Sequence, residues 1–333
     1  MDSKTVSIII PCYNEEKTIQ KVLTAILKQT YPVDKLEVLI ADGFSGDKTR
    51  EKIAEFQKNH PELAITTLDN PKQIIPAGLN IAIQAAQGEY IVRMDAHSEP
   101  NPMYIENTLQ LLQEGNADNV GGIWKILPSS NHWIAQSIAA AASHPFGVGD
   151  AFYRFATEGR YVDTVPFGGF KKELIDRIGM FDESLLTNED YEFNTRIREH
   201  GGKIWLEPDI QSNYYARETF RQLASQYWRY GYWKFRMLVR YPQSIKMRQA
   251  MPPLFVLSLL GLGLLSLFWM PARILLGIEG LLYFLVLLGG SWQEAQRRKQ
   301  WFLLLGMPLA IMIMHIVWGS GFLVSLLTNF RRS

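Results

Sequence analysis

The chain has 333 residues, which is enough for two structural units that each bury a core of their own. Its formal net charge is +1, so no overall basic field favours nucleic acid as a partner. The single cysteine, Cys12, excludes an intramolecular disulfide and fits a reducing compartment. The first apolar run, Val6–Ile10, is too short for the core of a secretory signal, so we expect the N-terminal part to stay in the cytosol.

Strand and helix patterns alternate along the N-terminal part of the chain. Four apolar or β-branched runs predict strands, at Val6–Ile10, Leu36–Ala41, Ala64–Leu68 and Glu89–Met94. Between them, helical spacing predicts a helix capped by Asn14, a second helix through Ile53 and Phe56, and a small-residue helix over Ala77–Ala86. This alternation predicts an α/β, Rossmann-like fold with a mostly parallel sheet and helices on both faces.

Polar clusters follow three of the predicted strands, at Cys12–Glu15, Asp42–Asp47 and Asp95–His97. Because ligands on parallel sheets bind beyond the carboxyl ends of the strands, we expect the three clusters to meet at one edge. Asp95 and His97 lie two residues apart, so on an extended strand their side chains would point the same way. The residue types alone allow a metal site, an acid–base pair or the ordinary polar end of a strand.

The turn after the first strand reads PCYNEE and contains no glycine, which argues against a dinucleotide dehydrogenase. A Walker-type phosphate loop is absent from the sequence too. A bound nucleotide would then depend on side chains, with Tyr13 or a neighbour against the base and Asp42 accepting from the base or ribose. A divalent ion between Asp95 and His97 would neutralise a diphosphate, and Mn²⁺ accepts an imidazole ligand more readily than Mg²⁺.

A second acidic cluster, Asn188, Glu189 and Asp190, begins another predicted helix. Asn is a common helix cap and acids favour the first turn, so the cluster could be purely structural. Equally, one carboxylate there could act as general base on a substrate hydroxyl. Gly168 and Gly169, upstream of this helix, would let the backbone approach a ligand closely, and we place them on the acceptor side.

The segment from Arg217 to Arg248 contains eight basic residues and one acid, interleaved with aromatic residues. This mixture suits a helix at a membrane surface, although it could also bind nucleic acid. The apolar segments that follow decide for a membrane: Pro252–Met270, Ala272–Gly290 and Trp301–Leu327. We therefore expect a cytosolic domain over residues 1–216, an interfacial segment over 217–250, and a membrane region over 251–333 with about three transmembrane helices.

Two features of the apolar region stay open at this point. Three spans starting from the cytosol would keep the basic stretch Gln293–Lys299 inside, as the positive-inside rule prefers, but would place the terminal Arg331 and Arg332 outside. Either that tail is too short to matter or one segment is re-entrant. Glu279, within the second segment, is either a functional acid or a group that neutralises a basic neighbour.

Five stretches occur in the order in which inverting family-2 glycosyltransferases have their motifs: SIIIPCYNEEKTI, IADGFSGDKT, GEYIVRMDAH, FGGFKKELIDRIGMFDESLLTNEDYEFNTRI and QYWRYG. Over roughly residues 5–240 the chain resembles this family, and most of all the bacterial branch that builds exopolysaccharides of the succinoglycan type. The resemblance implies a GT-A fold, a nucleotide-sugar donor with UDP as the expected nucleotide, and Mn²⁺ or Mg²⁺ as cofactor.

The resemblance also implies roles for individual residues. These are the nucleotide pocket at Pro11, Tyr13, Asn14 and Glu15, the base contact at Asp42, the metal and diphosphate site at Asp95 and His97, the catalytic Glu–Asp pair at Glu189 and Asp190, and a Gln-x-x-Arg-Trp element at Gln226, Arg229 and Tyr230. Asp190 is the expected catalytic base. His97 replaces an aspartate of the family pattern, which leaves the identity of the metal open, and Tyr230 replaces a tryptophan.

That second replacement, with only three apolar segments, argues against a processive polymer synthase. We expect a multi-pass protein of the inner (plasma) membrane whose cytosolic domain transfers one sugar to a lipid-linked or growing polysaccharide acceptor, with polysaccharide assembly proteins as candidate partners. One alternative is a polyprenyl-phosphate glycosyltransferase, which would use the lipid phosphate itself as acceptor. Another is a catalytically silent membrane scaffold that binds sugar nucleotide or organises an assembly complex.

Overall fold

The computed structural model describes residues 5–330, and the chain divides into two compact units. The first unit comprises the chain up to Lys125 together with Ala156–Tyr214, and the second comprises Ile126–Phe155 together with the chain from Tyr215 onward. The sequence did not reveal that Ile126–Phe155 groups with the C-terminal helices, because a short alanine-rich helix carries no signal of the partner it packs on. The division by role into cytosolic, interfacial and membrane regions stays a prediction.

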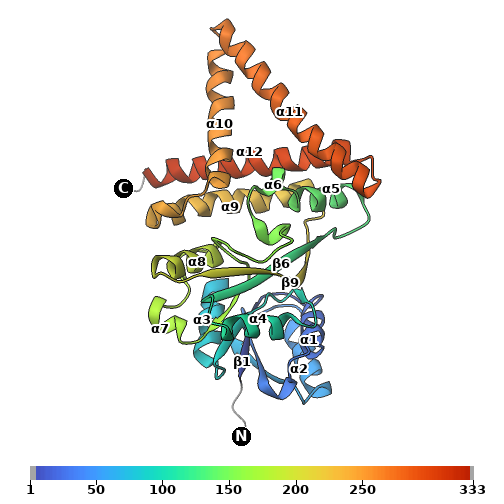
Figure 1. The fold of residues 1–333 in the computed structure, drawn as a ribbon, viewed down its shortest axis with the longest axis vertical. Coiled ribbons are helices and arrows are strands. Elements are labelled where there is room, and N and C mark those ends of the chain that lie inside the picture. The colour runs from blue at the N-terminus through green and yellow to red at the C-terminus, as the bar shows by residue number, and fades with distance from the viewer. Residues whose placement is uncertain (1–4, 331–333) are drawn as a thin grey trace. The chain divides into compact units, whose positions relative to one another are not determined.

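A nine-stranded sheet organises the first unit (Figure 1). In chain order its strands are β1 Val6–Cys12, β2 Leu36–Asp42, β3 Ala64–Asp69, β4 Tyr90–Arg93, β5 Glu99–Pro100, β6 Asn119–Leu127, β7 Arg160–Tyr161, β8 Gly169–Lys171 and β9 Ile204–Tyr215. The strand order is β3-β2-β1-β4-β8-β6-β9-β5, with β7 paired to β9. Strands β1 to β4 pair in parallel, and β8 runs antiparallel to both β4 and β6.

The parallel part of the sheet confirms the N-terminal predictions. All four predicted strands form, and so do the three helices between them, α1 Ile19–Leu27, α2 Thr49–Asn59 and α3 Ile75–Ala85. Figure 1 shows α1 and α2 on one side of β1 and α3 on the other, as right-handed crossovers require when the strand order reverses. Ile8 and Ile10 of β1 are fully buried because helices cover the sheet there.

The Rossmann-like α/β fold is thus confirmed, and the sheet is mixed. The antiparallel strands β5 and β7 have two residues each and β8 has three, which is too short for an alternating pattern to be visible in the sequence. The remaining helices of the first unit are α4 Tyr104–Gln113, α7 Leu174–Ile178 and α8 Glu189–Glu199. The predicted helix after Asn188 is therefore also present.

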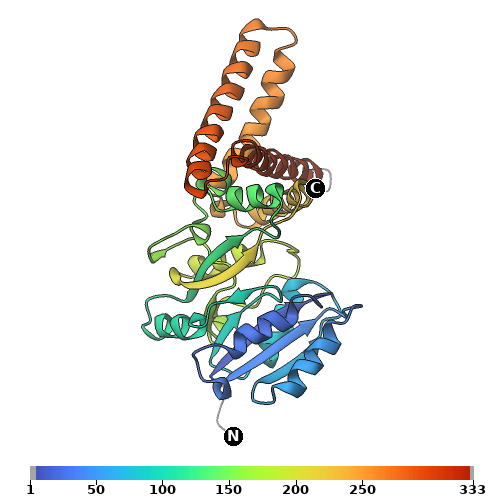
Figure 2. The same ribbon diagram turned by 90° about the vertical axis from the view of Figure 1, so that its right-hand side faces the viewer.

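The second unit is helical. Its helices are α5 Trp133–Ala142, α6 Pro145–Val148, α9 Phe220–Arg240, α10 Met247–Leu265, α11 Met270–Arg298 and α12 Leu303–Phe330. Three of them, α10, α11 and α12, are long and apolar enough to cross a membrane. Helices α10 and α11 form a hairpin, and α12 runs across its base (Figures 1 and 2). Most of the predicted basic and aromatic segment forms α9, which packs along α12, while the last residues of that segment begin α10.

Candidate active site

Two turns at the carboxyl ends of β1 and β2 are joined by hydrogen bonds. Asn14 has a left-handed backbone (φ 55°), its amide donates to Ser45 Oγ at 2.8 Å, and its Oδ1 accepts from the amide of Gly46 at 2.8 Å. The amide of Glu15 donates to Thr49 Oγ1 at 2.8 Å. Helix α1 begins only after Thr18, so the prediction that Asn14 caps the first helix is wrong. Asn14 instead ties the two turns together.

Asp42 ends β2 with its side chain fully buried. Its carboxylate accepts from Ser45 Oγ at 2.5 Å and from Arg50 Nε at 2.5 Å. Arg50 also bonds Asp69 at 2.6 Å, so this cation bridges the ends of β2 and β3. The predicted base-contacting carboxylate is therefore held in one orientation at the sheet edge, and its contact with a nucleotide stays a prediction.

The other predicted nucleotide residues lie beside these turns. Tyr13 is half exposed, and its ring is close enough to Gly43 that a Cβ there would come within 3.1 Å of it. Pro11 lies within β1, opposite Ala41 of β2, and is only partly exposed. Tyr13 thus offers an open ring beside the buried carboxylate, while Pro11 shapes the strand from which the turn leaves.

Asp95 and His97 belong to a turn and not to the strand. β4 ends at Arg93, and the amide of Ser98 donates to the carbonyl of Asp95 at 2.9 Å. The argument that an extended chain points both side chains the same way therefore does not hold. His97 instead reaches the first turn, where its Nδ1 lies 3.3 Å from Glu15 Oε1. Partial burial opposes ionisation of Glu15, but hydrogen bonds from His97 and Thr18 lower its pKa.

Arg93 connects the two acidic clusters, and sequence reasoning missed it. Its guanidinium is buried and contacts three carboxylates: Asp190, Glu189 at 2.9 Å and Asp95 at 3.2 Å. A basic residue at the end of an otherwise apolar strand was the available signal, because a buried cation requires anionic partners. The structure thereby brings the predicted diphosphate residue and the predicted catalytic pair to one guanidinium.

This cluster raises the pKa of Asp190 well above its usual range. Burial is the main cause, Arg93 opposes it, and the neighbouring carboxylates Glu189 and Asp95 add to the rise. A carboxyl group with a raised pKa is a stronger proton acceptor than an ordinary aspartate, as a general base for a sugar hydroxyl needs to be. Its side chain keeps 27% exposure, so a ligand can reach it.

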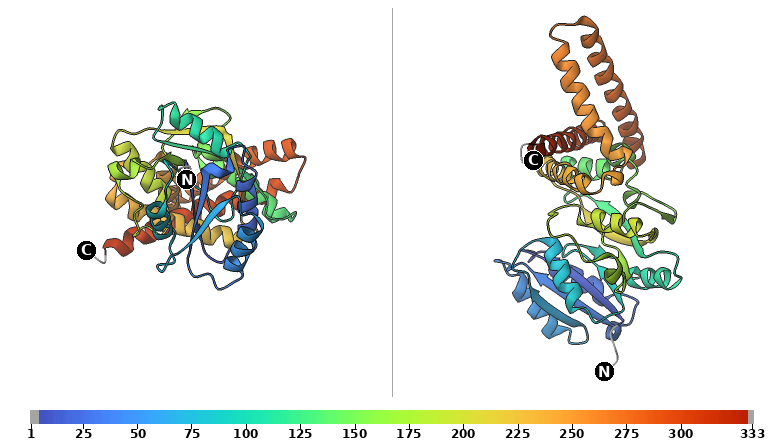
Figure 3. Two further views of the ribbon diagram at one scale, coloured as in Figure 1. Left: turned by 90° about the horizontal axis from the view of Figure 1, so that it is seen from below. Right: turned by 90° about the vertical axis from the view of Figure 1, so that its left-hand side faces the viewer.

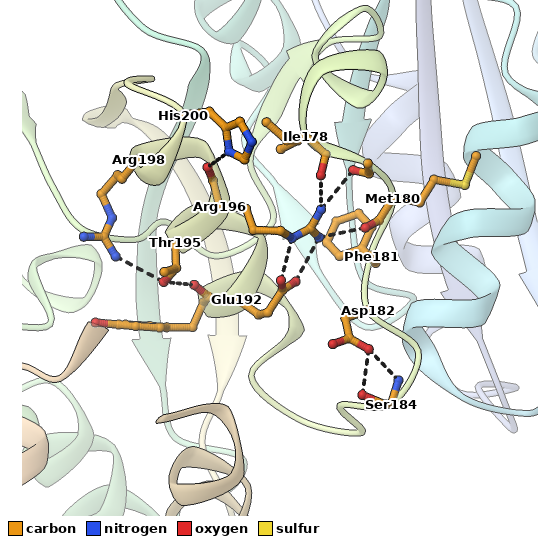
Figure 4. Close-up of polar contacts among 12 residues, drawn as sticks. Ile178, Met180, Phe181, Asp182, Ser184, Glu192, Thr195, Arg196, Arg198 and His200 are labelled. Atoms are coloured by element: carbon orange, nitrogen blue, oxygen red, sulfur yellow. Dashed lines mark hydrogen bonds and ion pairs between the residues drawn. The ribbon is translucent and has the colours of Figure 1, made fainter. Parts of the chain in front are cut away.

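Helix α8, which carries Glu189 and Asp190, is fixed to the preceding loop by one arginine. Figure 4 shows Arg196 between Glu192 on its own helix and the carbonyl groups of Ile178 and Met180. The bonds from Arg196 to these carbonyls measure 2.5 and 2.7 Å. At the helix start, Asn188 is left-handed (φ 70°) and makes no capping bond with its side chain, so the capping explanation of this residue is wrong.

Gly168 and Gly169 are needed for packing. A Cβ on Gly168 would collide with the side chain of Asn119, and one on Gly169 would collide with Thr108. Gly168 also has a positive φ of 42°, which disfavours any other residue. Protein atoms therefore occupy the positions that a side chain would take at these two glycines, and their placement on the acceptor side stays a prediction. The backbone here lies next to Arg93, whose amide donates to the carbonyl of Gly168 at 3.1 Å.

A metal site built only from protein side chains is absent from the part of the chain that the structure describes, since no three His, Cys, Asp or Glu residues are grouped for one. Asp95 and His97 nevertheless fit an ion that shares its ligands with a diphosphate, because such ions need only one or two protein ligands. Their side chains are 20% and 47% exposed, and together they offer one oxygen and one nitrogen donor.

The last predicted element lies in the second unit. Gln226 and Tyr230 are one turn apart on α9, and Gln226 Nε2 donates to the Tyr230 hydroxyl at 3.1 Å. Arg229 is exposed on the same helix. That these three residues contribute to the site formed by the first unit stays a prediction.

The matched sequences define the class of protein. Residues 7–179 match the family model described as Glycosyl transferase family 2, so the chain belongs to this family of glycosyltransferases. It is 34% identical over 232 residues to "Dolichyl N-acetyl-alpha-D-glucosaminyl phosphate 3-beta-D-2,3-diacetamido-2,3-dideoxy-beta-D-glucuronosyltransferase" of Methanococcus voltae, covering 68% of this chain and 71% of that one. It is 29% identical over 328 residues to the succinoglycan biosynthesis protein ExoA of Rhizobium meliloti (strain 1021), covering 98% of this chain and 96% of that one.

A solved structure confirms the fold. The mannosyltransferase PcManGT from Pyrobaculum calidifontis, solved in complex with GDP-Man and Mn²⁺, matches 94% of this chain and 86% of its own with a TM-score of 0.64 and 20% sequence identity. The predicted GT-A domain, followed by long apolar helices at the C-terminus, is therefore confirmed, as is the resemblance to the succinoglycan-type branch.

Proposed function

We propose that this protein is a membrane-bound inverting glycosyltransferase that moves one sugar from a nucleotide sugar, expected to be a UDP-sugar, to a lipid-linked or growing polysaccharide acceptor. The observation that carries the proposal is the sharing of Arg93 by Asp95 and Asp190. In a displacement at an anomeric carbon, the leaving diphosphate and the attacking hydroxyl are separated by a single sugar ring. Asp95, which we assign to the diphosphate, and Asp190, which we assign to the hydroxyl, both contact the single guanidinium of Arg93.

In the proposed reaction, the acceptor hydroxyl attacks the anomeric carbon while the bond from this carbon to the diphosphate oxygen breaks. Asp190 accepts the hydroxyl proton, and the electron pair of the broken bond leaves with the diphosphate. A divalent ion, when held by Asp95 and His97, would neutralise the charge on the diphosphate. A single displacement inverts the configuration, so an α-linked donor yields a β-linked product.

The nature of the acceptor is supported by the relatives. The protein of Methanococcus voltae is named for transfer to a dolichyl-phosphate-linked sugar, and that of Rhizobium meliloti for succinoglycan biosynthesis. The three long apolar helices support a membrane location. The proposal places the first unit in the cytosol. A positioned base favours a hydroxyl acceptor over a lipid phosphate, because a phosphate is already ionised and needs no proton acceptor.

Membranes containing the full-length chain should transfer label from one nucleotide sugar to the lipid fraction and release the nucleoside diphosphate. Asp190→Asn should abolish most of this transfer, while Asp176→Asn, an exposed acid on α7, should retain it. Mild acid should release a labelled oligosaccharide from the lipid. Release of the labelled monosaccharide alone would identify a polyprenyl-phosphate glycosyltransferase. Failure of every nucleotide sugar to release diphosphate would favour the silent scaffold.

A further inference from the structure

Helix α12 is long and apolar enough to cross a membrane, yet it packs along α9 and α5. If it crossed the membrane after the α10–α11 hairpin, the chain would end on the side opposite to its start. The terminal Arg331 and Arg332 would then lie outside, against the positive-inside rule. The packing of the second unit offers a different arrangement, and this arrangement does not depend on the reaction proposed above.

Contacts hold α12 along most of its length. A Cβ on Gly306 would collide with Ser137 of α5, and one on Gly321 would lie 2.6 Å from the carbonyl oxygen of Trp228 on α9. Between these points, a Cβ on Gly231 of α9 would collide with the carbonyl oxygen of Trp318. From Gly306 to Gly321 a helix advances about 22 Å. α12 is therefore pressed against α5 at one end and α9 at the other.

Neither of these supporting helices is suited to span the bilayer. α9 carries five basic residues and no acid, Arg221, Arg229, Lys234, Arg236 and Arg240. At the centre of a bilayer each costs about 2.5–3.5 kcal/mol on insertion scales. α5 lies in a segment that leaves the first unit at Lys125 and returns to it at Ala156, so both ends of the segment stay on the side of that unit. If α12 crossed the bilayer, one of the two helices packed on it, α5 or α9, would have to enter the bilayer as well.

The α10–α11 hairpin has the opposite character. Its base is anchored on the same segment, since Arg248 bonds Asp150 at 2.6 Å and a Cβ on Gly290 would lie 2.7 Å from the ring of Phe146. Above this base, α10 has 19 residues, and α11 has a similar length before Gly290, about 28–30 Å each. Glu279 is held inside the hairpin, where it accepts from Ser258 Oγ. At the far end, Phe268 is 85% exposed.

We propose that only the α10–α11 hairpin spans the membrane. In this arrangement α12 lies in the plane of the bilayer surface, on the same side of the membrane as the first unit. In Figures 1 and 3 the hairpin rises away from α12, which runs across its base. The open face of α12 is apolar: Leu305, Leu309, Ile316, Val324 and Leu327. Such a face enters the boundary between headgroups and acyl chains. Trp292 and Trp301, with ring centroids 5.7 Å apart, mark the junction of α11 and α12 as an interface.

The location of the C-terminus tests this arrangement directly. The full-length chain, with Cys12→Ser, Lys58→Cys and a protease-cleavable tag after Ser333, is placed in sealed membrane vesicles of each orientation. Lys58 is exposed on the first unit and reports its side through an impermeant maleimide. We expect the protease to remove the tag only from vesicles in which Lys58→Cys reacts. Removal only from the opposite vesicles would show that α12 crosses, and would overturn the proposal.

Two further measurements test the hairpin and the depth of α12. Phe268→Cys, in the Cys12→Ser background, should react from the side opposite to Lys58→Cys. Reaction from the same side, or only after detergent, would overturn the spanning hairpin. Nitroxide labels at Leu305, Ile316 and Leu327 should then show similar depths in lipid vesicles. A label at Ile316 that lies much deeper in the bilayer than the labels at Leu305 and Leu327 would mean that α12 crosses the bilayer.

Discussion

Replacing Arg93 provides the sharpest test of the site, because this side chain holds three carboxylates together. Arg93 is 2% exposed, and Arg93→Gln would leave Asp95, Glu189 and Asp190 without their shared cation. Removing one partner of a buried ion pair costs about 3–5 kcal/mol. Total stabilities of domains are about 5–15 kcal/mol, so the variant should fold but with a clearly lower unfolding temperature.

The same change should shift the pH dependence of turnover. Asp190 must be ionised to accept a proton, so kcat falls as pH drops through the pKa of Asp190, which burial has already raised. Arg93 opposes this rise. An opposite charge nearby lowers a carboxyl pKa by about 1–3 units, so removing Arg93 should move the acid limb of the kcat profile to higher pH by about that much. Arg93→Lys keeps the charge without the fork of donors and should shift the limb less.

The assay measures kcat and KM against pH in detergent-solubilised full-length protein, with thermal unfolding recorded for each variant. Arg177→Gln is the matched control, because Arg177 is 48% exposed and pairs with Asp118 away from the cluster. It should change stability by at most about 1 kcal/mol and leave the pH profile unchanged. A folded Arg93→Gln protein with the pH profile of the wild type would refute the role assigned to this cluster.

Three further predictions concern single residues. Asp190→Asn should lower kcat by about 10²–10⁴ with donor binding nearly intact in titration calorimetry, and a wild-type kcat would mean that another group is the base. His97→Asp should raise activation by Mg²⁺ relative to Mn²⁺, and an unchanged ratio would contradict ligation by His97. Gly321→Leu should overpack the contact with Trp228 and destabilise the second unit by about 1–3 kcal/mol. Gly277→Leu is the control and should not destabilise the unit, because nothing lies within 4 Å of a Cβ at Gly277. Equal unfolding temperatures for the two variants would contradict this prediction.

Local patterns in the sequence were sufficient for the parallel half of the fold. The runs that became β1, β2 and β4 are buried along nearly their whole length because helices cover both faces of the sheet there, and this is visible without any knowledge of partners. The edge strand β3 was predicted from its β-branched residues, and it is largely exposed. The order of the polar turns then followed from the topology of parallel strands, which delivers their carboxyl ends to one edge. Five motifs in sequence order were also enough to indicate the family, which the matched sequences confirm.

Only the tertiary structure decided how the polar residues pair. Arg93 and Asp190 are 97 positions apart in the sequence. An arginine within an apolar strand indicates that anionic partners are required, but the sequence does not identify them. Likewise, the turn at Asp95 and the contact of His97 with Glu15 depend on where β4 ends, a boundary that the run of apolar residues does not mark.

The apolar C-terminal helices show the same limit on a larger scale. Their composition determined that each is long and apolar enough for a bilayer, since hydropathy is a property of the segment itself. The neighbours of each helix depend on the shapes of distant segments. Glycines such as Gly231 and Gly321 allow α9 and α12 to pack closely, and only the folded chain brings them together.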